Sequence, residues 1–217
     1  MYGACVASNG VSFTINSHGA TRCTLLLFKP QASKPYARIP FPDSYRIGDT
    51  YSMLVFDIKP DEFEYAFSFD GPYEPAKGLL FNEENVLLDP YSRAVTGQRK
   101  WGEKPEGGKD FEYRARVVKS SFDWGNIKQL EQPFEDLVIY ETHVRGYTKD
   151  KSSGVSAPGT FAGLKDKIPY LKDLGINAVE LMPIFEFDEM ESARVVDGVQ
   201  LYNYWGYNTV SFFAPNT

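Results

Sequence analysis

Four stretches in the first 75 residues alternate apolar and polar residues or form short apolar runs, with turn-forming residues between them. They read GVSFTIN, TRCTLLLF, TYSMLVFDI and FEYAFSFDG. Side chains of a β-strand point alternately to opposite faces, so this pattern predicts strands with a buried face. Short strands at regular spacing, separated by Gly, Pro and Asn, predict a small antiparallel β-sandwich.

Aromatic residues make up 15% of the 217-residue chain, a high share for a globular protein. Aromatic side chains either fill a core or stack on flat ligands such as sugars and bases. In the last predicted strand, Tyr65, Phe67 and Phe69 fall on one face at a period of two. We assign this face to the sandwich core in preference to a glycan platform.

The charge balance disfavours several classes of partner. The chain carries 29 acidic and 23 basic residues, a net charge of -6, so we expect no nucleic-acid partner. No apolar stretch approaches the ~20 residues of a membrane span, and the N-terminus lacks a signal-peptide pattern. We therefore expect a soluble, cytoplasmic protein with no membrane partner. Cys5 and Cys23 are expected to be buried thiols, because two cysteines make neither a disulfide framework nor a zinc site.

The pattern changes along the rest of the chain. Residues 71–135 are rich in Pro and Gly around the apolar island NVLLDPYSRAV, which indicates a connecting region packed along a neighbour. From Asp136, DLVIYETHV is a near-continuous apolar run, typical of a parallel strand buried on both faces.

A helix and a second strand follow. The helix lies in GTFAGLKDKIPYLKDLG, with Thr160 as a cap, Pro169 at the start of the main helix and Gly175 just past its end. INAVELMPI then supplies the second strand. Strand, helix and strand form a βαβ unit, whose crossover is expected to be right-handed.

Three blocks carry a family resemblance: VIYETHVRGYT, GTFAGLKDKIPYLKDLGINAVELMPIFEF and NYWGYNTVSFFAPNT. In this order and spacing they resemble the start of the catalytic barrel of α-amylase superfamily glycosidases, and most of all the isoamylase-type bacterial glycogen-debranching enzymes. The strands of the first half are similar to the carbohydrate-binding-type sandwich that precedes that barrel.

The resemblance implies a multidomain β plus α/β protein. An N-terminal immunoglobulin-like β-sandwich is followed by the first βαβ part of an incomplete TIM (β/α)8 barrel. The expected domains are a carbohydrate-binding-type sandwich at 1–95, a connecting region at 96–135 and the start of the glycoside hydrolase barrel at 136–217. Binding modules of the family use exposed tryptophans, and residues 1–75 contain none. We therefore favour a structural role for the sandwich.

The implied function is hydrolysis of α-1,6 branch linkages in glycogen or other branched α-glucans, by a retaining mechanism and without a cofactor. In the family the catalytic acids follow later barrel strands, so we expect them beyond Thr217 and none within this chain. Two alternatives remain open. One is a stand-alone glucan-binding or regulatory module, and the other is a glucan branching transferase.

Tyr207 and Asn208 are the candidate substrate-binding residues. By the resemblance, Tyr207 matches the aromatic residue that stacks on the glucose before the scissile bond, and Asn208 matches a polar residue of the same pocket. Trp205 is expected to pack beneath them. Glu141, Glu180 and His143 lie on or beside the two predicted parallel strands, and we assign them structural roles.

The stretch FEFDEMESARVVDG carries five acids. Hard cations favour several oxygen ligands, and some relatives bind calcium near this position. The ligand pattern of those relatives does not match here residue for residue, so we expect a solvated acidic loop and no metal site. The acids are Glu186, Asp188, Glu189, Glu191 and Asp197.

Overall fold

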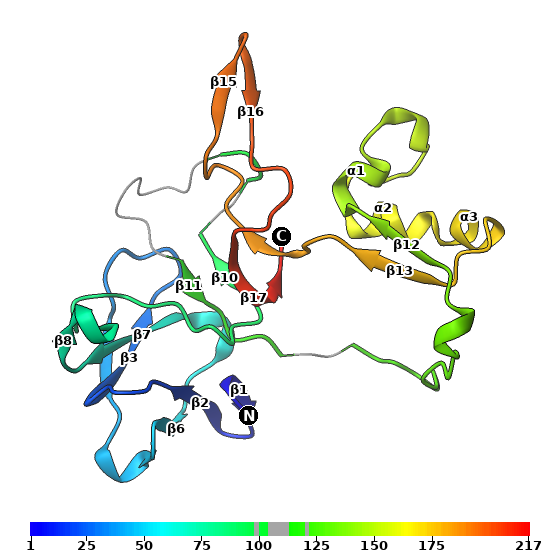
Figure 1. Cartoon of the computed structure of the whole chain (residues 1–217). Helices are drawn as coiled ribbons and strands as arrows, with labels where there is room; N and C mark the ends of the chain where they lie inside the picture. Colours follow the sequence, from blue (N-terminus) through cyan, green and yellow to red (C-terminus); the bar gives the residue numbers. More distant parts are fainter. Residues whose placement is uncertain (98–99, 104–112, 120–121) are drawn as a thin grey trace. The chain divides into compact units, whose positions relative to one another are not determined.

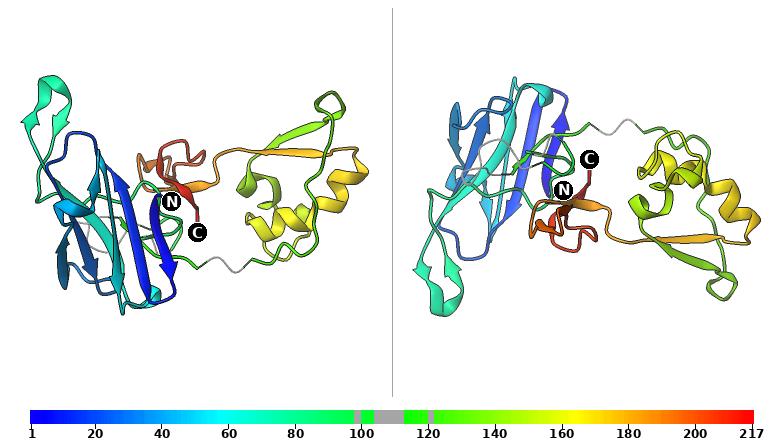
Figure 2. Two further views of the ribbon diagram at one scale, coloured as in Figure 1. Left: turned by 90° about the horizontal axis from the view of Figure 1, so that it is seen from below. Right: turned by 90° about the horizontal axis from the view of Figure 1, so that it is seen from above.

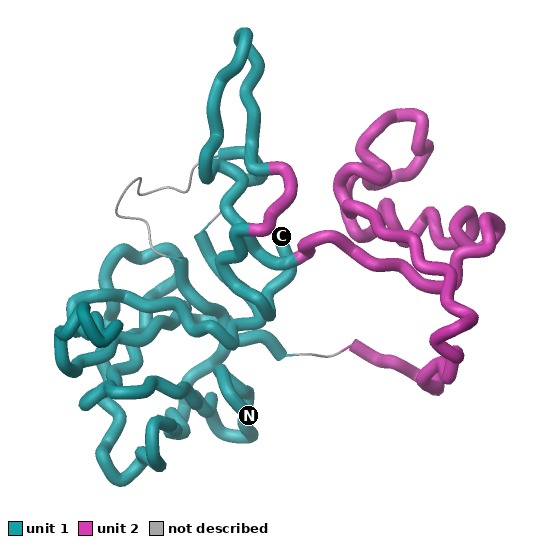
Figure 3. Tube along the Cα trace, viewed as in Figure 1, with its two compact units in different colours: residues 1–121, 185–203, 208–217 teal, residues 122–184, 204–207 magenta. Residues whose placement is uncertain are grey.

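The computed structural model forms two compact units (Figures 1 and 3). It describes residues 1–97, 100–103, 113–119 and 122–217. Unit 1 comprises residues 1–121, 185–203 and 208–217, and unit 2 comprises residues 122–184 and 204–207. Part of the expected connecting region, including much of EKPEGGKD, lies outside the described residues.

Unit 1 contains two antiparallel sheets with a shared core (Figures 1 and 2). The first sheet, in the order β1-β2-β6-β5, has strands β1 (Gly3–Ala7), β2 (Gly10–Asn16), β5 (Arg46–Ile47) and β6 (Thr50–Phe56). The second sheet, in the order β10-β11-β7-β3-β4, has strands β3 (Arg22–Phe28), β4 (Ala37–Pro40), β7 (Glu64–Asp70), β10 (Val95–Thr96) and β11 (Arg114–Ala115). The predicted antiparallel sandwich is confirmed.

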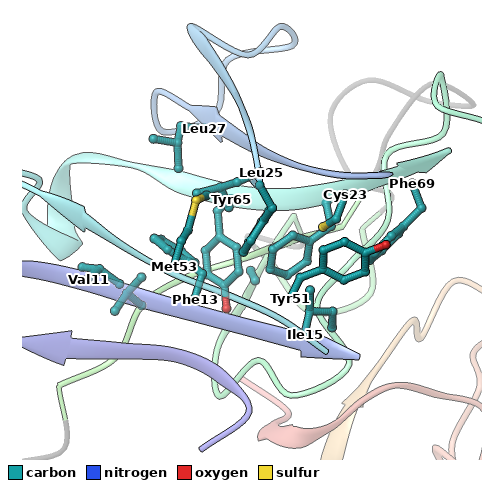
Figure 4. Close-up of a cluster of buried hydrophobic side chains, with 14 of the residues drawn as sticks. Val11, Phe13, Ile15, Cys23, Leu25, Leu27, Tyr51, Met53, Tyr65 and Phe69 are labelled. Carbon is teal, nitrogen blue, oxygen red and sulfur yellow. The ribbon is translucent and has the colours of Figure 1, made fainter. Parts of the chain in front are cut away.

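Alternate residues of the central strands fill the core between the sheets (Figure 4). Each of them is at most 7% exposed: Val11, Phe13 and Ile15 from β2, Tyr51 and Met53 from β6, and Tyr65, Phe67 and Phe69 from β7. Several neighbouring rings meet edge to face, as between Phe13 and Tyr65 at 5.1 Å. The assignment of the β7 aromatic face to the core is confirmed.

Strand β3 is covered on both faces. Leu25 and Leu27 belong to the core between the sheets, whereas Leu26 and Phe28 pack with Ala66 in a second cluster. This accounts for the near-continuous apolar run of TRCTLLLF, because both sides of the strand exclude water.

The second sheet extends past the expected boundary at residue 95, because β11 pairs with both β10 and β7. Arg114 of β11 is buried, with its guanidinium 3.7 Å from the centre of the Phe28 ring. It also forms an ion pair with buried Glu64 at 3.7 Å and donates to the Ala32 carbonyl. A buried cation is tolerated only when it is paired in this way.

The segment that follows the sandwich strands is anchored by a buried carboxylate, Asp89, which is 0% exposed. Asp89 accepts hydrogen bonds from the Tyr65 hydroxyl at 2.7 Å and from the Tyr91 backbone N–H at 2.8 Å. Burial raises the pKa of Asp89, and these two hydrogen bonds oppose the shift. The turn at residues 89–92 is thereby fixed to the core strand β7.

This turn contacts the last strand of the chain, β17 (Thr209–Pro215). The hydroxyls of Ser92 and Ser211 lie 3.2 Å apart, and Ser211 also donates to the Ser92 carbonyl. The Tyr91 ring is stacked with Tyr2, at 4.8 Å, and with Phe213, at 5.7 Å. Residues far apart in the sequence therefore meet around one turn of the sandwich.

Smaller elements complete unit 1. Strand β14 (Phe185–Phe187) pairs with β17, β15 (Arg194–Val196) with β16 (Val199–Leu201), and β8 (Tyr73–Glu74) with β9 (Leu79–Leu80). The β15-β16 hairpin extends away from the rest of the unit (Figure 1). Short 3-10 helices of the chain are η1 (Asp43–Tyr45), η2 (Pro60–Glu62), η3 (Pro75–Lys77), η5 (Phe134–Asp136) and η6 (Lys151–Ser153).

The two cysteines differ in burial. Cys23 is fully buried in the core, as predicted, and burial raises the pKa of its thiol. Cys5 is only partly buried. The prediction was wrong for Cys5 because β1 is an edge strand of the first sheet.

Unit 2 contains the predicted βαβ unit. Strands β12 (Ile139–Thr142) and β13 (Ala178–Leu181) are parallel, and helices α1 (Val144–Thr148), α2 (Phe161–Asp166) and α3 (Ile168–Asp173) lie between them in the sequence. The Thr160 hydroxyl caps α2 by accepting from the Gly163 N–H at 3.2 Å. Pro169 lies in the first turn of α3, and Gly175 follows it with φ +88°. These three local predictions are confirmed.

The strand pair is less buried than predicted. Ile139 is 52% exposed and Val179 is 42% exposed, so the prediction of a strand covered on both faces was wrong for β12. A sheet of two strands offers too few neighbours to cover both of its faces.

In the part of the chain that the structure describes, no helix is long and apolar enough to cross a membrane.

The Tyr65 hydroxyl makes the stability of unit 1 sensitive to alkaline pH. Burial and the neighbouring Asp89 carboxylate raise the pKa of Tyr65 well above its ordinary value of 10.0. The folded state therefore keeps this proton where the unfolded chain loses it. The contribution of the protonated Tyr65 hydroxyl to the free energy of unfolding is fully present below pH 10. It is lost as the pH rises from 10 through the raised pKa of the folded state. We expect a smaller loss of stability above pH 10 in Tyr65→Phe, measured by urea unfolding at several pH values.

The half-exposed Tyr45 offers a matched control. Tyr45→Phe should follow the unmodified chain at every pH. Parallel stability curves for Tyr65→Phe and the unmodified chain would contradict the assignment.

Candidate functional site

His143, at the carboxyl end of β12, organises the candidate site in unit 2. Its Nδ1 accepts a hydrogen bond from the Gly146 backbone N–H at 3.0 Å, so this nitrogen carries no proton. Its Nε2 then donates to the Tyr204 carbonyl, also at 3.0 Å. Both ring nitrogens are engaged with the backbone, and no lone pair remains for a general base. The predicted structural role of His143 is confirmed.

The same imidazole holds an aromatic cluster. The Tyr204 ring is stacked on His143 with centroids 4.3 Å apart and an angle of 16°. Trp205 meets both rings edge-on, at 5.8 Å from His143 and 5.1 Å from Tyr204. Trp205 thus packs on His143 and Tyr204, although 51% of it remains exposed. Its expected position beneath Tyr207 and Asn208 stays a prediction.

Tyr207 lies two residues after this packed cluster. Gly206 between them is buried and adopts φ +73°, a conformation that favours glycine. The Tyr207 side chain is 68% exposed, and its ring contacts no other aromatic ring in the described ranges. Asn208 is also exposed. A fixed backbone thus presents an open tyrosine ring, and the glucose-stacking role of Tyr207 and Asn208 stays a prediction.

Glu141 and Glu180 are direct neighbours in the parallel register of β12 and β13. Both side chains are exposed. Register neighbours point to the same face of a sheet, so two carboxylates lie side by side on this strand pair. Their assignment to a structural role stays a prediction.

The expectation of a solvated acidic loop is wrong for two of the five acids. Glu186 is 5% exposed and Glu189 is 2% exposed, whereas Glu191 and Asp197 are exposed. For Glu186 the reason is strand pairing, because it lies in β14 opposite Ser211 of β17. One face of an antiparallel sheet is commonly packed away from water, and a side chain on that face is buried.

Glu186 has polar partners of its own. Its carboxylate accepts from the Asn216 amide at 3.2 Å, and from the N–H and hydroxyl of Thr217 at 3.4 and 3.2 Å. Burial raises the pKa of Glu186, which these hydrogen bonds partly offset. This acid therefore holds the residues that follow β17. Within the described residues, no cluster of three or more His, Cys, Asp or Glu side chains is arranged to hold a metal ion.

Comparison with known proteins places this geometry in a family. Residues 1–92 match the model of carbohydrate-binding module 48, the isoamylase N-terminal domain. The sandwich of unit 1 is therefore a carbohydrate-binding module of the isoamylase type.

The similarity continues beyond that module. The chain is 37% identical to isoamylase 1 of Oryza sativa subsp. japonica over 98% of its own length and 27% of that protein. It is 34% identical to a glycogen debranching enzyme of Serratia proteamaculans, over 99% of its length and 33% of that enzyme. The chain is thus similar to isoamylases and glycogen debranching enzymes along nearly its whole length, and it spans about a third or less of these relatives.

Solved structures agree with this placement at the level of the fold. A pullulanase from Paenibacillus barengoltzii in complex with maltohexaose and α-cyclodextrin matches with a TM-score of 0.74 at 21% identity. The match covers all of this chain and 32% of the pullulanase. At 21% sequence identity, the comparison supports only the arrangement of the backbone.

Gly146 tests how tightly the His143 cluster is packed. A Cβ atom at this position would overlap the hydroxyl of Tyr204. Gly146→Ala should therefore displace the Tyr204 ring and destabilise unit 2, although alanine favours a helix over glycine by about 1 kcal/mol. The loss is measured by thermal unfolding and by the fluorescence of the adjacent Trp205.

The double variant supplies the control. With Tyr204→Phe the obstructing hydroxyl is gone, so adding Gly146→Ala should stabilise the protein. The same destabilisation in both backgrounds would show that Tyr204 is not the obstacle.

Proposed function

We propose that this chain is the N-terminal part of a glycosidase that hydrolyses α-1,6 branch linkages in glycogen-like α-glucans. The observation that carries the proposal is the continuity of the similarity. Relatives named as isoamylases and debranching enzymes align along 98% or more of the chain, through both units. A match confined to the sandwich would favour a simple binding module instead.

The parallel strand pair of unit 2 supports a barrel. A TIM barrel is built from repeated strand–helix units, takes ~250 residues, and carries its active site at the carboxyl ends of the strands. Residues 136–217 supply only the first such units in this proposal. His143 and the aromatic cluster lie at the carboxyl end of β12, where barrel enzymes build their sites.

The proposed chemistry is that of a retaining glycosidase. One carboxylate attacks the anomeric carbon and a second carboxylic acid protonates the leaving oxygen, at a separation of about 5–5.5 Å. We place both acids on barrel strands outside these 217 residues. Glu141 and Glu180 are left out of the catalytic pair.

Tyr207 would form one wall of the glucose subsite. The flat face of a tyrosine covers the C–H surface of a pyranose ring, and an exposed ring on a fixed backbone suits that contact. Asn208, the next residue, would add a hydrogen bond to the sugar. The packed neighbours Tyr204 and Trp205 would set the position of the Tyr207 backbone.

The reaction is tested with the parent protein that contains this chain. Incubation with glycogen should raise the number of reducing ends, and the first product should have the α anomeric configuration. Tyr207→Ala should lower kcat/KM by about tenfold or more. As the control, replacing the half-exposed Tyr45 with alanine should leave kcat/KM unchanged.

Other outcomes separate the alternatives. Transfer of branches without new reducing ends would make the parent a branching transferase. Reversible binding of glycogen without any reaction would make it a binding module. Hydrolysis by the 217-residue chain alone would contradict the placement of the catalytic acids.

A further inference from the structure

Unit 2 contains a hollow that the candidate site does not use. It has a volume of about 230 Å³ and lies among β12, the end of α1, the η6 turn and the start of α3. Three tyrosines line it, Tyr140, Tyr147 and Tyr170, together with Asp150 and Lys167 and two serines. Tyr207 is not among the lining residues.

The tyrosines form an aromatic wall. The rings of Tyr140 and Tyr147 meet edge to face at 5.8 Å and 69°. Tyr170 on α3 is 57% exposed, so its ring remains accessible beside the hollow. Aromatic rings in this arrangement offer the apolar surface on which the C–H face of a sugar ring packs.

The hydroxyl of Tyr147, in this wall, makes no hydrogen bond to any described residue. It is also shielded from water. Burial raises the pKa of Tyr147, and the nearby tyrosines Tyr140 and Tyr170 raise it further. A buried hydroxyl without a partner is unfavourable, so this side of the wall is not packed to satisfy its own polar groups.

The charged groups of the hollow balance each other. Asp150 accepts from the Ser152 N–H with one oxygen, at 2.9 Å, and no ion pair in the described parts of the chain involves Lys167. One acid and one base disfavour a ligand of strong net charge, and their desolvation disfavours a purely apolar one. Pockets of this kind fix a ligand with a few polar groups set among aromatic surface.

We propose that this hollow binds a neutral pyranose ring, namely a glucosyl unit of an α-glucan. The tyrosines would contact the C–H face, and Asp150 and Lys167 would hydrogen-bond the ring hydroxyls. The choice of glucose over other sugars rests on the proposed function. The binding of a polyhydroxylated ring rests on the lining residues alone.

The test is a titration of the ¹⁵N-labelled 217-residue chain with maltotriose, followed by amide chemical shifts. Saturable shifts are expected at residues 150–154 and 167–170. Tyr170→Ala and Lys167→Met should each weaken this binding about tenfold. Both residues are at least partly exposed, so these variants are expected to fold. Lys172→Met, on the same helix but outside the lining, is the matched control and should leave it unchanged.

Two further arms make the outcomes decisive. Sorbitol, an open-chain polyol, should produce no saturable shifts, because it lacks the flat ring face. Maltotriose shifts that are confined to residues 204–208, or that persist in Tyr170→Ala, would overturn the proposal and leave the proposed hydrolase intact. Saturable shifts at the hollow in a parent protein without debranching activity would support the site and refute that hydrolase.

Discussion

The hydrogen bond from the Tyr65 hydroxyl to Asp89 is the interaction on which the organisation of unit 1 depends. A carboxylate that is fully buried is unfavourable unless its oxygens are satisfied, and Asp89 has both Tyr65 and the Tyr91 N–H as donors. Tyr65 belongs to the core strand β7, so the turn after Asp89 is fixed relative to the sandwich. Ser211 and Phe213 of β17 then contact this turn. One buried acid thereby links the carbohydrate-binding module to a segment more than 100 residues later in the sequence.

Unit 2 uses a polar side chain in a similar way. His143 joins the start of α1 to Tyr204 through both of its ring nitrogens, and its ring carries the stacked tyrosine. The aromatic cluster is therefore positioned by a neutral imidazole with a defined tautomer. The open ring of Tyr207 follows this cluster, which gives the proposed sugar contact a fixed backbone. In the proposed glycosidase, neither His143 nor the register pair of Glu141 and Glu180 needs to take part in the chemistry.

Local features were predictable from the sequence, and features that depend on distant pairing were not. The alternation in β2 and β7, the Thr160 cap and the glycine after α3 each depend on a few neighbouring residues. The burial of Glu186 depends on the pairing of β14 with β17, which no local pattern reveals. A signal for the β15-β16 hairpin was present in Asp197 and Gly198, which both adopt positive φ, because Asp-Gly favours a two-residue hairpin turn. Tyr207 was proposed only from the family resemblance, since a single exposed tyrosine has no distinctive local pattern.

The most direct test of the central linkage is native-state hydrogen exchange of Asp89→Ala. If Asp89 fixes the turn that contacts β17, amides of β17 such as Ser211 should lose protection by about tenfold more than amides of the β2-β6 ladder such as Phe13. As a control, replacing the exposed Asp43 with alanine should change the protection of neither the β17 amides nor the β2-β6 amides. An equal loss of protection in both strands, or no loss at β17, would contradict the account.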